Sequence, residues 1–517
     1  MKKRFIKYII LVLALPLLFG CIGKFEEYNK NPYEPSKVSP YAPLSEMFKI
    51  YANAQQNACQ FNNTMWASFS GHVCETGVWG GRGFYYYAAP DNFNDGSWGD
   101  NFTKVSNNLY QIESMTEGSG VPYALAKLTR VYSIQVLLSL YGPIPYTKAE
   151  RGATKIPYDN EETAWHAAFD ELDEVITLLG LATGVDPDLR DNDQFYNGDC
   201  SKWLKFANTL KLRMAIRISG KDPEYAKRKA EEAVAGGVME GVDDSCWDWT
   251  NSGEPNGYKI VGGWGEVRAN ACLTSVMNGY NDPRRPKYFT EQSVNANGGY
   301  VGVRHGSAIS QAYHNTCGNY SNLQSAINET APTVVMYAAE AAFLRAEGAL
   351  KGWNMGGTAQ EFYEKGIRLS FDEFKADGAD AYIADGTSTP AAYVDNLQTG
   401  SGSTANNHPA MSDITIKWAD DGRELERILT QKWIAVYLDP LNGWSDFRRT
   451  GYPKLFQSDH SDDASCNTTR GQRRLRFPQS EYQNNPDNVN AAVAMLSNGQ
   501  DKNGTDLWWA LKSNGQY

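Results

Sequence analysis

The sequence predicts an all-α fold built from stacked helical hairpins, with long irregular loop-rich insertions between them. Three observations support this prediction. Segments with helical length and periodicity follow one another in consecutive pairs. Small residues recur where paired helices would touch. The stretches between the pairs are rich in Gly, Asn and aromatic residues and have no sustained periodicity.

The predicted helices carry apolar residues at three- and four-residue spacing. Residues 121–141 begin with Pro122 near the start, where proline fits a helix. Residues 160–179 begin with Glu161 and Glu162, which suit the positive end of a helix dipole. The other predicted helices are 201–219, 223–235, 333–351, 359–374 and 421–438.

The small residues expected at helix contacts are Ala207, Ala339, Ala342 and Ala346. Stacked hairpins of this kind form solenoids, and TPR-like pairs are the nearest named form. We expect these helices mainly within 102–240, 333–375 and 421–438. Three variable loop regions separate or precede them, at 71–101, 241–330 and 376–420. Inserts of this length are usually functional or disordered, and their aromatic residues argue against disorder.

The N-terminus has the parts of a secretory signal. Basic residues at 2–7 precede an apolar stretch, Ile9 to Phe19, which is too short for a membrane span of about 20 residues. The sequence Leu18-Phe19-Gly20-Cys21 looks like a bacterial lipobox, which implies cleavage before Cys21 and fatty acylation of it. The alternative is an ordinary signal peptide with an incidental cysteine.

These features divide the chain into a lipoprotein signal peptide at 1–20, a polar tether at 21–40 and one domain at 41–517. Removal of the signal's four basic residues moves the net charge from −11 to about −15. An acidic surface of this size argues against nucleic acid as a partner. Seven cysteines besides Cys21 show no CxxC spacing, which makes zinc unlikely to be bound. Either a Cys59–Cys74 disulfide or buried free thiols would fit.

Four stretches together resemble the SusD/RagB family of nutrient-binding outer-membrane lipoproteins. They are Tyr28-Asn29-Lys30-Asn31-Pro32, "LYGPIPY" at 140–146, "VMYAAEAAFLRAEGAL" at 335–350, and "ILTQKWIAVYLDPLNGWSDFRRTGYPKL" at 428–455 continuing to 492. The resemblance implies about four TPR-like helix pairs and a location on the cell surface, at the outer membrane. It also implies a SusC-like TonB-dependent transporter as partner, an oligosaccharide or peptide as ligand, and no enzymatic activity.

Arg448 and Arg449 in "GWSDFRRTGYPKL" could clamp an anion, but a structural role is favoured. In that structural role the two arginines would donate hydrogen bonds to helix-end carbonyls or to carboxylates such as those of Glu424 and Glu481, and Gly451 would shape the turn. Arg345 and Glu347, on an Ala-rich helix, are likewise expected to make internal pairs.

The stretch 77–101 carries many aromatic residues among glycines, Asn and Asp. A sugar ring has an apolar face that stacks on an aromatic platform, and hydroxyls that bond to amides, carboxylates or Arg. Residues 246–266 repeat this composition with Trp247, Trp249 and Tyr258. The predicted ligand contacts are Trp79, Arg82, Tyr85, Tyr86, Trp98, Asn101 and Trp264. The alternative is that these aromatics seal the loops onto the helices, and Trp98 in particular could pack at the next helix start.

No resident cofactor is expected. Asp191, Asp193, Asn197 and Asp199 offer oxygen ligands for Ca²⁺, but Phe195 and Tyr196 occupy positions where an EF-hand needs an oxygen and a glycine. A solvated turn fits better. The sequence also lacks HExxH, GxSxG and Walker A motifs. Three functions remain open: a nutrient-binding lipoprotein, a surface glycoside hydrolase, and a TPR-type adaptor without a small ligand.

Overall fold

The computed structural model describes twelve ranges of the chain. They are residues 39–51, 65–76, 86–87, 91–149, 152–182, 184–248, 257–263, 265–291, 299–307, 317–324, 332–395 and 406–510.

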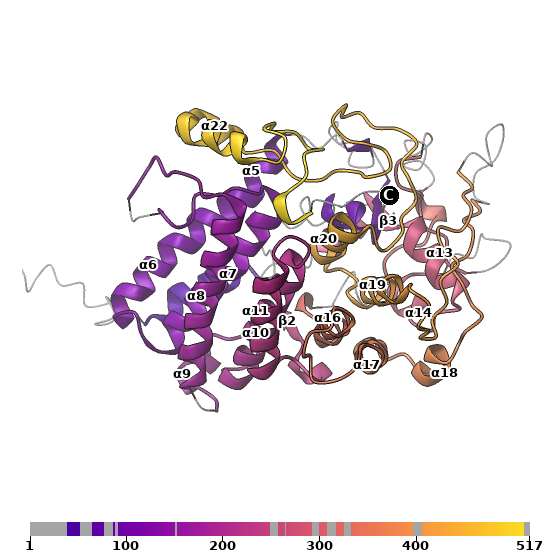
Figure 1. Ribbon diagram of the computed structural model, residues 1–517, viewed down its shortest axis with the longest axis horizontal. Helices are drawn as coiled ribbons and strands as arrows, with labels where there is room; N and C mark the ends of the chain where they lie inside the picture. Colours follow the sequence, from indigo (N-terminus) through magenta and orange to yellow (C-terminus); the bar gives the residue numbers. More distant parts are fainter. Residues whose placement is uncertain are drawn as a thin grey trace, which may run out of the picture.

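The N-terminal half of the fold is a row of helices, on the left of Figure 1. Successive helices pack on one another: α6 on α7, α7 on α8, α8 on α10, and α10 on α11. The π-helical turn η3 joins α5 to α6 without a break. The elements are α3 (Tyr41–Phe48), α5 (Asp91–Gly99), η3 (Asp100–Lys104), α6 (Val105–Thr116), α7 (Gly120–Leu140), α8 (Glu161–Gly180), α9 (Pro187–Arg190), α10 (Cys200–Ile218) and α11 (Pro223–Ala235).

The middle of the chain forms short elements and two small antiparallel sheets. β1 (Val73–Glu75) pairs with β3 (Val267–Ala269), and β2 (Cys246–Asp248) pairs with β4 (Thr333–Met336). Short helices surround these sheets, so the predicted loop region 241–330 contains much regular structure. They are η4 (Val242–Asp244), α12 (Gly257–Gly263), α13 (Ala271–Gly279), α14 (Arg285–Tyr288) and η7 (Cys317–Asn319).

The C-terminal part adds a second group of packed helices, in which α16 contacts α17 and α19. The final segment runs over the top of the N-terminal row, where α22 is visible in Figure 1. The elements are α16 (Ala338–Leu350), α17 (Ala359–Glu373), α18 (Ala379–Ile383), α19 (Glu424–Ala435), α20 (Pro440–Thr450), α21 (Gln479–Asn484), α22 (Pro486–Met495) and η9 (Trp508–Ala510).

The predicted helices are confirmed, except that the one predicted at 333–351 begins later, at Ala338. Residues 333–336 form strand β4 instead of the first turn of the next helix, because Thr333, Val334 and Val335 are β-branched and pair with β2. Cys74 is a buried free thiol, so the disulfide considered with Cys59 does not form. Cys59 itself lies outside the described residues.

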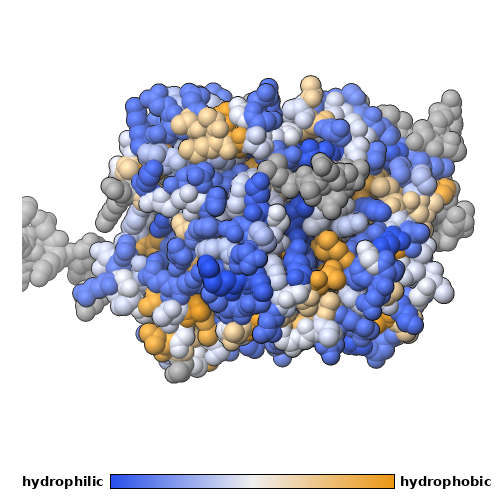
Figure 2. Space-filling view, viewed as in Figure 1, coloured by the Kyte–Doolittle hydropathy of each residue, from blue (hydrophilic) through white to orange (hydrophobic). Residues whose placement is uncertain are grey.

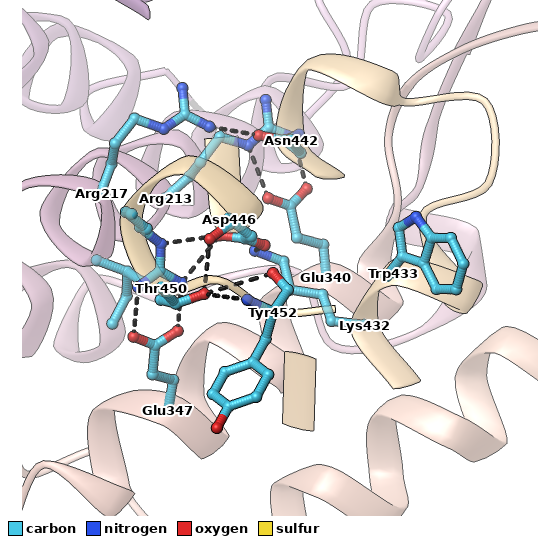
Figure 3. Close-up of polar contacts among 12 residues, drawn as sticks. Arg213, Arg217, Glu340, Glu347, Lys432, Trp433, Asn442, Asp446, Thr450 and Tyr452 are labelled. Carbon is cyan, nitrogen blue, oxygen red and sulfur yellow. Dashed lines mark hydrogen bonds and ion pairs between the residues drawn. The ribbon is translucent and has the colours of Figure 1, made fainter. Parts of the chain in front are cut away.

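Buried ion pairs connect the two groups of helices (Figure 3). Arg213 of α10 makes a bidentate pair with Glu340 of α16, with N–O distances of 2.8 and 2.5 Å. Both side chains are almost wholly shielded from solvent. Arg217, one turn further along α10, donates to Gln135, Ser139 and Asn442. The two hydrogen bonds between Arg213 and Glu340 offset the burial of their opposite charges. Arg217 meets neutral acceptors, and burial lowers its pKa.

A second buried cluster joins α16, α19 and α20. Arg449 donates to both oxygens of Glu347, at 2.7 and 2.5 Å, and to Asp446 at 2.9 Å. Lys432 of α19 lies 2.9 Å from the other oxygen of Asp446. Burial by itself would raise the pKa of Asp446, but Lys432 and Arg449 outweigh it and lower the pKa to about 2.

The structural interpretation of the two arginines is therefore confirmed, but with different partners. Arg448 donates to the carbonyls of Ser139 and Arg473, and Arg449 binds Glu347 and Asp446 instead of Glu424 or Glu481. Gly451 ends α20 with a φ of +80°, a left-handed conformation that glycine adopts without strain. The expected internal pairing of Arg345 and Glu347 is also confirmed, since Arg345 pairs with Glu240.

Replacement of Glu347 by alanine should leave Arg449 buried with half of its charge partners, and should cost about 3–5 kcal/mol of unfolding free energy. Chemical denaturation of the soluble protein measures this change. The matched control is Asp380→Ala, because Asp380 is 86% exposed and its pair with Arg368 lies at the surface. That control should cost less than about 1 kcal/mol. Equal losses in the two variants would contradict a structural role for the buried cluster.

The buried carboxyl of Glu161 should make the stability of the fold depend on pH. This carboxyl is buried at the start of α8, and one of its oxygens accepts from the Trp508 backbone N–H. Burial raises its pKa to about 8, against the opposing effects of the Trp508 N–H, Arg474 and Arg448. Folding therefore favours the protonated carboxyl.

A carboxyl with a raised folded-state pKa stabilises the fold at acid pH, and this contribution is lost as the pH rises through about 8. The Glu161→Gln variant should lack this loss. Denaturation at pH 5 and pH 9 should thus show a smaller fall in stability for the variant than for the wild type. An identical fall in both proteins would show that Glu161 is already ionised in the folded protein at neutral pH.

Candidate functional site

Three of the predicted ligand contacts lie in the described part of the chain: Tyr86, Trp98 and Asn101. All three are buried, with 8%, 6% and 5% of their surface exposed. The other predicted contacts, Trp79, Arg82, Tyr85 and Trp264, lie outside the described residues, as do the lipobox and Cys21.

Trp98 belongs to an aromatic cluster that holds α5 against the body. Its ring stacks near Tyr158 at 6.0 Å between centroids and meets Tyr141 edge-on at 5.1 Å. Phe102 and Phe477 complete the cluster. Rings from three distant segments enclose Trp98, so it offers no open platform in this structure, and its contact with a ligand stays a prediction. Trp98 packs near the end of α5, just before η3, which fits the alternative that it seals its segment onto the helices.

Tyr86 and Asn101 are also held by internal bonds. The Tyr86 hydroxyl donates to the Ser307 carbonyl at 2.8 Å, and its ring meets His460 edge-on. The Asn101 amide donates to the Ser97 carbonyl one helical turn earlier, at 2.8 Å. Both side chains are buried in this structure, and their contact with a ligand stays a prediction.

A large cavity lies between α10, the β2–β4 sheet and the end of α17. Its volume is about 910 Å³, at the upper end of the range of about 300–1,000 Å³ that is typical of small-molecule sites. Its lining brings together loops that are distant in the sequence. The aromatic residues at the cavity include Tyr196, Trp247, Tyr258, Tyr337, Phe374 and Tyr437.

The charged residues at this cavity are balanced in sign. Three lysines and three carboxylates line it, so their formal charges cancel. They are Lys202, Lys287, Lys375, Asp243, Asp372 and Glu373. Amides of Asn197 and Gln324 add further hydrogen-bonding groups. A cavity with rings, donors and acceptors but no excess charge suits a neutral polar ligand.

Glu373, at the last position of α17, fixes the orientation of Trp247. The Trp247 indole N–H donates to one Glu373 oxygen at 2.8 Å, and the Ser245 hydroxyl donates to the other at 2.8 Å. The Ser245 oxygen in turn accepts from the Ala338 backbone N–H at 2.9 Å. Burial raises the pKa of Glu373; the hydrogen bonds from Ser245 and Trp247 oppose this shift, and the nearby Asp243 charge adds to it.

Neighbouring groups also hold the aromatic residues of the cavity in place. Tyr337 meets the Trp247 ring edge-on at 5.3 Å, and its hydroxyl donates to the Tyr437 carbonyl at 2.6 Å. Tyr437 stacks on Tyr288 at 4.3 Å. Composition alone had indicated Trp247 and Tyr258. Glu373 and Tyr337 were missed because they lie at the ends of helical segments and gain their roles only through contacts across the sequence.

The turn considered for Ca²⁺ uses its carboxylates internally. Asp193 accepts from the backbone N–H groups of Phe195, Tyr196 and Gly198 and from the Trp203 indole. Asp199 caps α10. Elsewhere in the described ranges, Glu162, His166 and Asp222 bring potential ligand atoms within 4.8 Å of one another. Their side chains lie at or near the surface.

One face of the molecule is mostly polar. The face in Figure 2 is largely hydrophilic, and its apolar residues gather in small separate areas. Within the described ranges, every helix is too short or too polar to cross a bilayer.

Comparisons with known proteins now define the class. The family model for SusD-like proteins, described as SusD and RagB outer membrane lipoproteins, matches residues 28–510. A solved SusD-like protein from Bacteroides thetaiotaomicron is 62% identical, with a TM-score of 0.88; the match covers 93% of this chain and 100% of that one. Among curated proteins, none matches the chain.

Two further solved structures are similar. A chitin-binding SusD homologue from Flavobacterium johnsoniae is 35% identical, with a TM-score of 0.83 over 92% of this chain and 98% of that one. A SusD homologue from Bacteroides ovatus is 32% identical, with the same TM-score over 92% and 99%. The chain is thus a helical, TPR-like protein of the SusD type. It belongs to the SusD/RagB family of outer membrane lipoproteins.

Proposed function

We propose that this protein is a nutrient-binding lipoprotein of the cell surface, which captures an oligosaccharide and delivers it to a SusC-like TonB-dependent transporter. The observation that carries this proposal is membership of the SusD/RagB family over nearly the whole chain. The similar structure described as chitin-binding supports a glycan as the ligand. A peptide ligand is the alternative within the same function.

In this proposal the protein binds its ligand without altering it. Capture requires binding that is weak enough to permit release. A few aromatic stacks, which contribute about 0.5–1.5 kcal/mol each, give an affinity of this kind. We expect dissociation constants between about 1 μM and 1 mM. Trp79, Arg82, Tyr85 and Trp264 remain the proposed ligand contacts in the Gly-rich segments. A glycoside hydrolase would instead release new reducing ends from the glycan.

The proposed function predicts glycan binding by residues 22–517 produced without the lipid anchor. Calorimetric titration with chitohexaose, maltohexaose, cellohexaose and xylohexaose should identify a ligand, and the Trp79→Ala and Trp264→Ala variants should each bind it several-fold more weakly. A reducing-end assay on the same mixtures should stay at background. Accumulation of reducing ends would show that this function is wrong, whereas failure of all four glycans to bind would contradict a glycan ligand and leave the peptide alternative.

Cys21 is proposed as the acylated residue that holds the protein in the outer membrane. Two or more acyl chains, at about 0.8 kcal/mol per buried CH₂, anchor a protein stably. The Cys21→Ser variant should therefore lose its acyl chains and leave the outer-membrane fraction, whereas Cys74→Ser should stay, because Cys74 is buried in the fold. Retention of the Cys21→Ser protein in that membrane would refute the anchor.

A further inference from the structure

The Trp247 cavity differs from the Gly-rich segments proposed above as ligand contacts, because its lining residues lie in the described part of the chain and several of them belong to helices or strands. Trp247 lies on β2, Glu373 ends α17, and Tyr337 lies between β4 and α16. The cavity volume of about 910 Å³ exceeds what a few waters need. Trp247 is only partly buried although neighbouring groups fix its ring.

We propose that this cavity is a saccharide-binding site in which Trp247 is the platform for a sugar ring and Glu373 is the positioning residue that orients it. This inference rests on the proposed function and adds a specific site to it.

The contacts of Glu373 explain why a carboxylate stands there. Both of its oxygens already accept, one from Trp247 and one from Ser245, whose own oxygen is occupied by the Ala338 N–H. The ionised carboxylate satisfies both donors at once, whereas a protonated carboxyl would place a hydrogen against one of them. The indole is thereby locked at its N–H edge, and little side-chain entropy remains to be lost when a ligand binds.

The remaining lining favours a neutral sugar. Hydroxyl groups both donate and accept, so they match a wall that carries lysines, carboxylates and amides. The equal numbers of opposite charges give no net attraction to an acidic or a basic ligand. Flat rings such as those of Trp247 and Phe374 match the apolar face of a pyranose.

Trp418 offers a matched control for the platform. It is also a partly buried tryptophan, and its indole N–H also donates to a carboxylate, that of Asp420, at 2.9 Å. It lies apart from the cavity lining. Replacement of either tryptophan by alanine therefore removes similar local contacts, but only Trp247→Ala changes the cavity.

The test is calorimetric titration of the wild type, Trp247→Ala and Trp418→Ala with the four hexasaccharides named above. We expect Trp247→Ala to bind the preferred glycan about tenfold more weakly, or to show one site fewer, and Trp418→Ala to match the wild type. Unchanged binding in Trp247→Ala, with weaker binding in Trp79→Ala or Trp264→Ala, would overturn this site and leave the proposed function intact. If the wild type binds none of the glycans, this saccharide site and the glycan ligand of the proposed function both fail, and the peptide alternative remains.

A second measurement separates positioning from folding and does not need Trp247→Ala to fold. In the wild type, acidification through the raised pKa of Glu373 should weaken binding, because the protonated oxygen is a poorer acceptor for the donor that it faces. Glu373→Gln should bind more weakly than the wild type at neutral pH, and its affinity should change less with pH. Other ionisable groups face the same cavity: Lys202, Asp243, Lys287, Asp372 and Lys375. They are common to both proteins, so the difference between the two pH profiles reports Glu373.

Identical pH profiles for the wild type and Glu373→Gln would overturn the positioning role. A hexapeptide that binds the wild type and loses affinity in Trp247→Ala, while glycan binding is unaffected by that change, would overturn the assignment of a saccharide to the cavity.

Discussion

Buried ion pairs between distant helices are the constraint on which the rest of this structure depends. Arg213 and Glu340 are 127 positions apart, and Arg449 and Glu347 are 102 apart, yet each pair meets through two parallel hydrogen bonds. A buried charge without its partner is costly, so these pairs allow little alternative packing of α10, α16 and α20. The β2–β4 sheet and the Trp247 cavity lie against this group, through contacts of η4 with α10, α16 and α17. The rigid core therefore sets the geometry of the cavity wall.

The core and the cavity use different kinds of residue, and the chemistry of these residues explains the difference. Arginine presents a planar fork that matches a carboxylate at two points, which suits permanent pairs between helices. The cavity uses lysines, amides and rings, two of which, those of Trp247 and Phe374, are only partly buried; such contacts are weaker and compatible with a ligand that must leave again. A protein that captures and releases a nutrient needs both properties. Tryptophan occurs in both environments. Trp98 is packed among other rings, whereas Trp247 lines the cavity with its indole N–H held by Glu373.

Much of the fold could be predicted from the sequence, because helix periodicity is a local property. The features that could not be predicted depend on contacts between distant segments. An apolar run such as 333–336 fits a strand or a helix until its partner strand is known. Internal pairing of Arg345, Glu347 and Arg449 could be anticipated, but the partners could not, since charge pairs between distant segments leave no local signal. Likewise, the environment of Trp98 comes from Tyr141, Tyr158 and Phe477, which composition around residue 98 does not show. Trp247 was indicated by its Gly- and Trp-rich surroundings, whereas Glu373 looked like an ordinary helix-end carboxylate.

The central claim is that a helical scaffold fixed by buried charges presents ring-bearing surfaces that hold a saccharide and leave it chemically intact. A crystal structure of residues 22–517 grown with the glycan that binds most tightly tests this claim most directly. We expect density for an uncleaved saccharide whose ring lies against an aromatic side chain of the cavity or of the Gly-rich segments, with the helices unmoved. A cleaved saccharide, or one held wholly by groups other than aromatic rings, would contradict it.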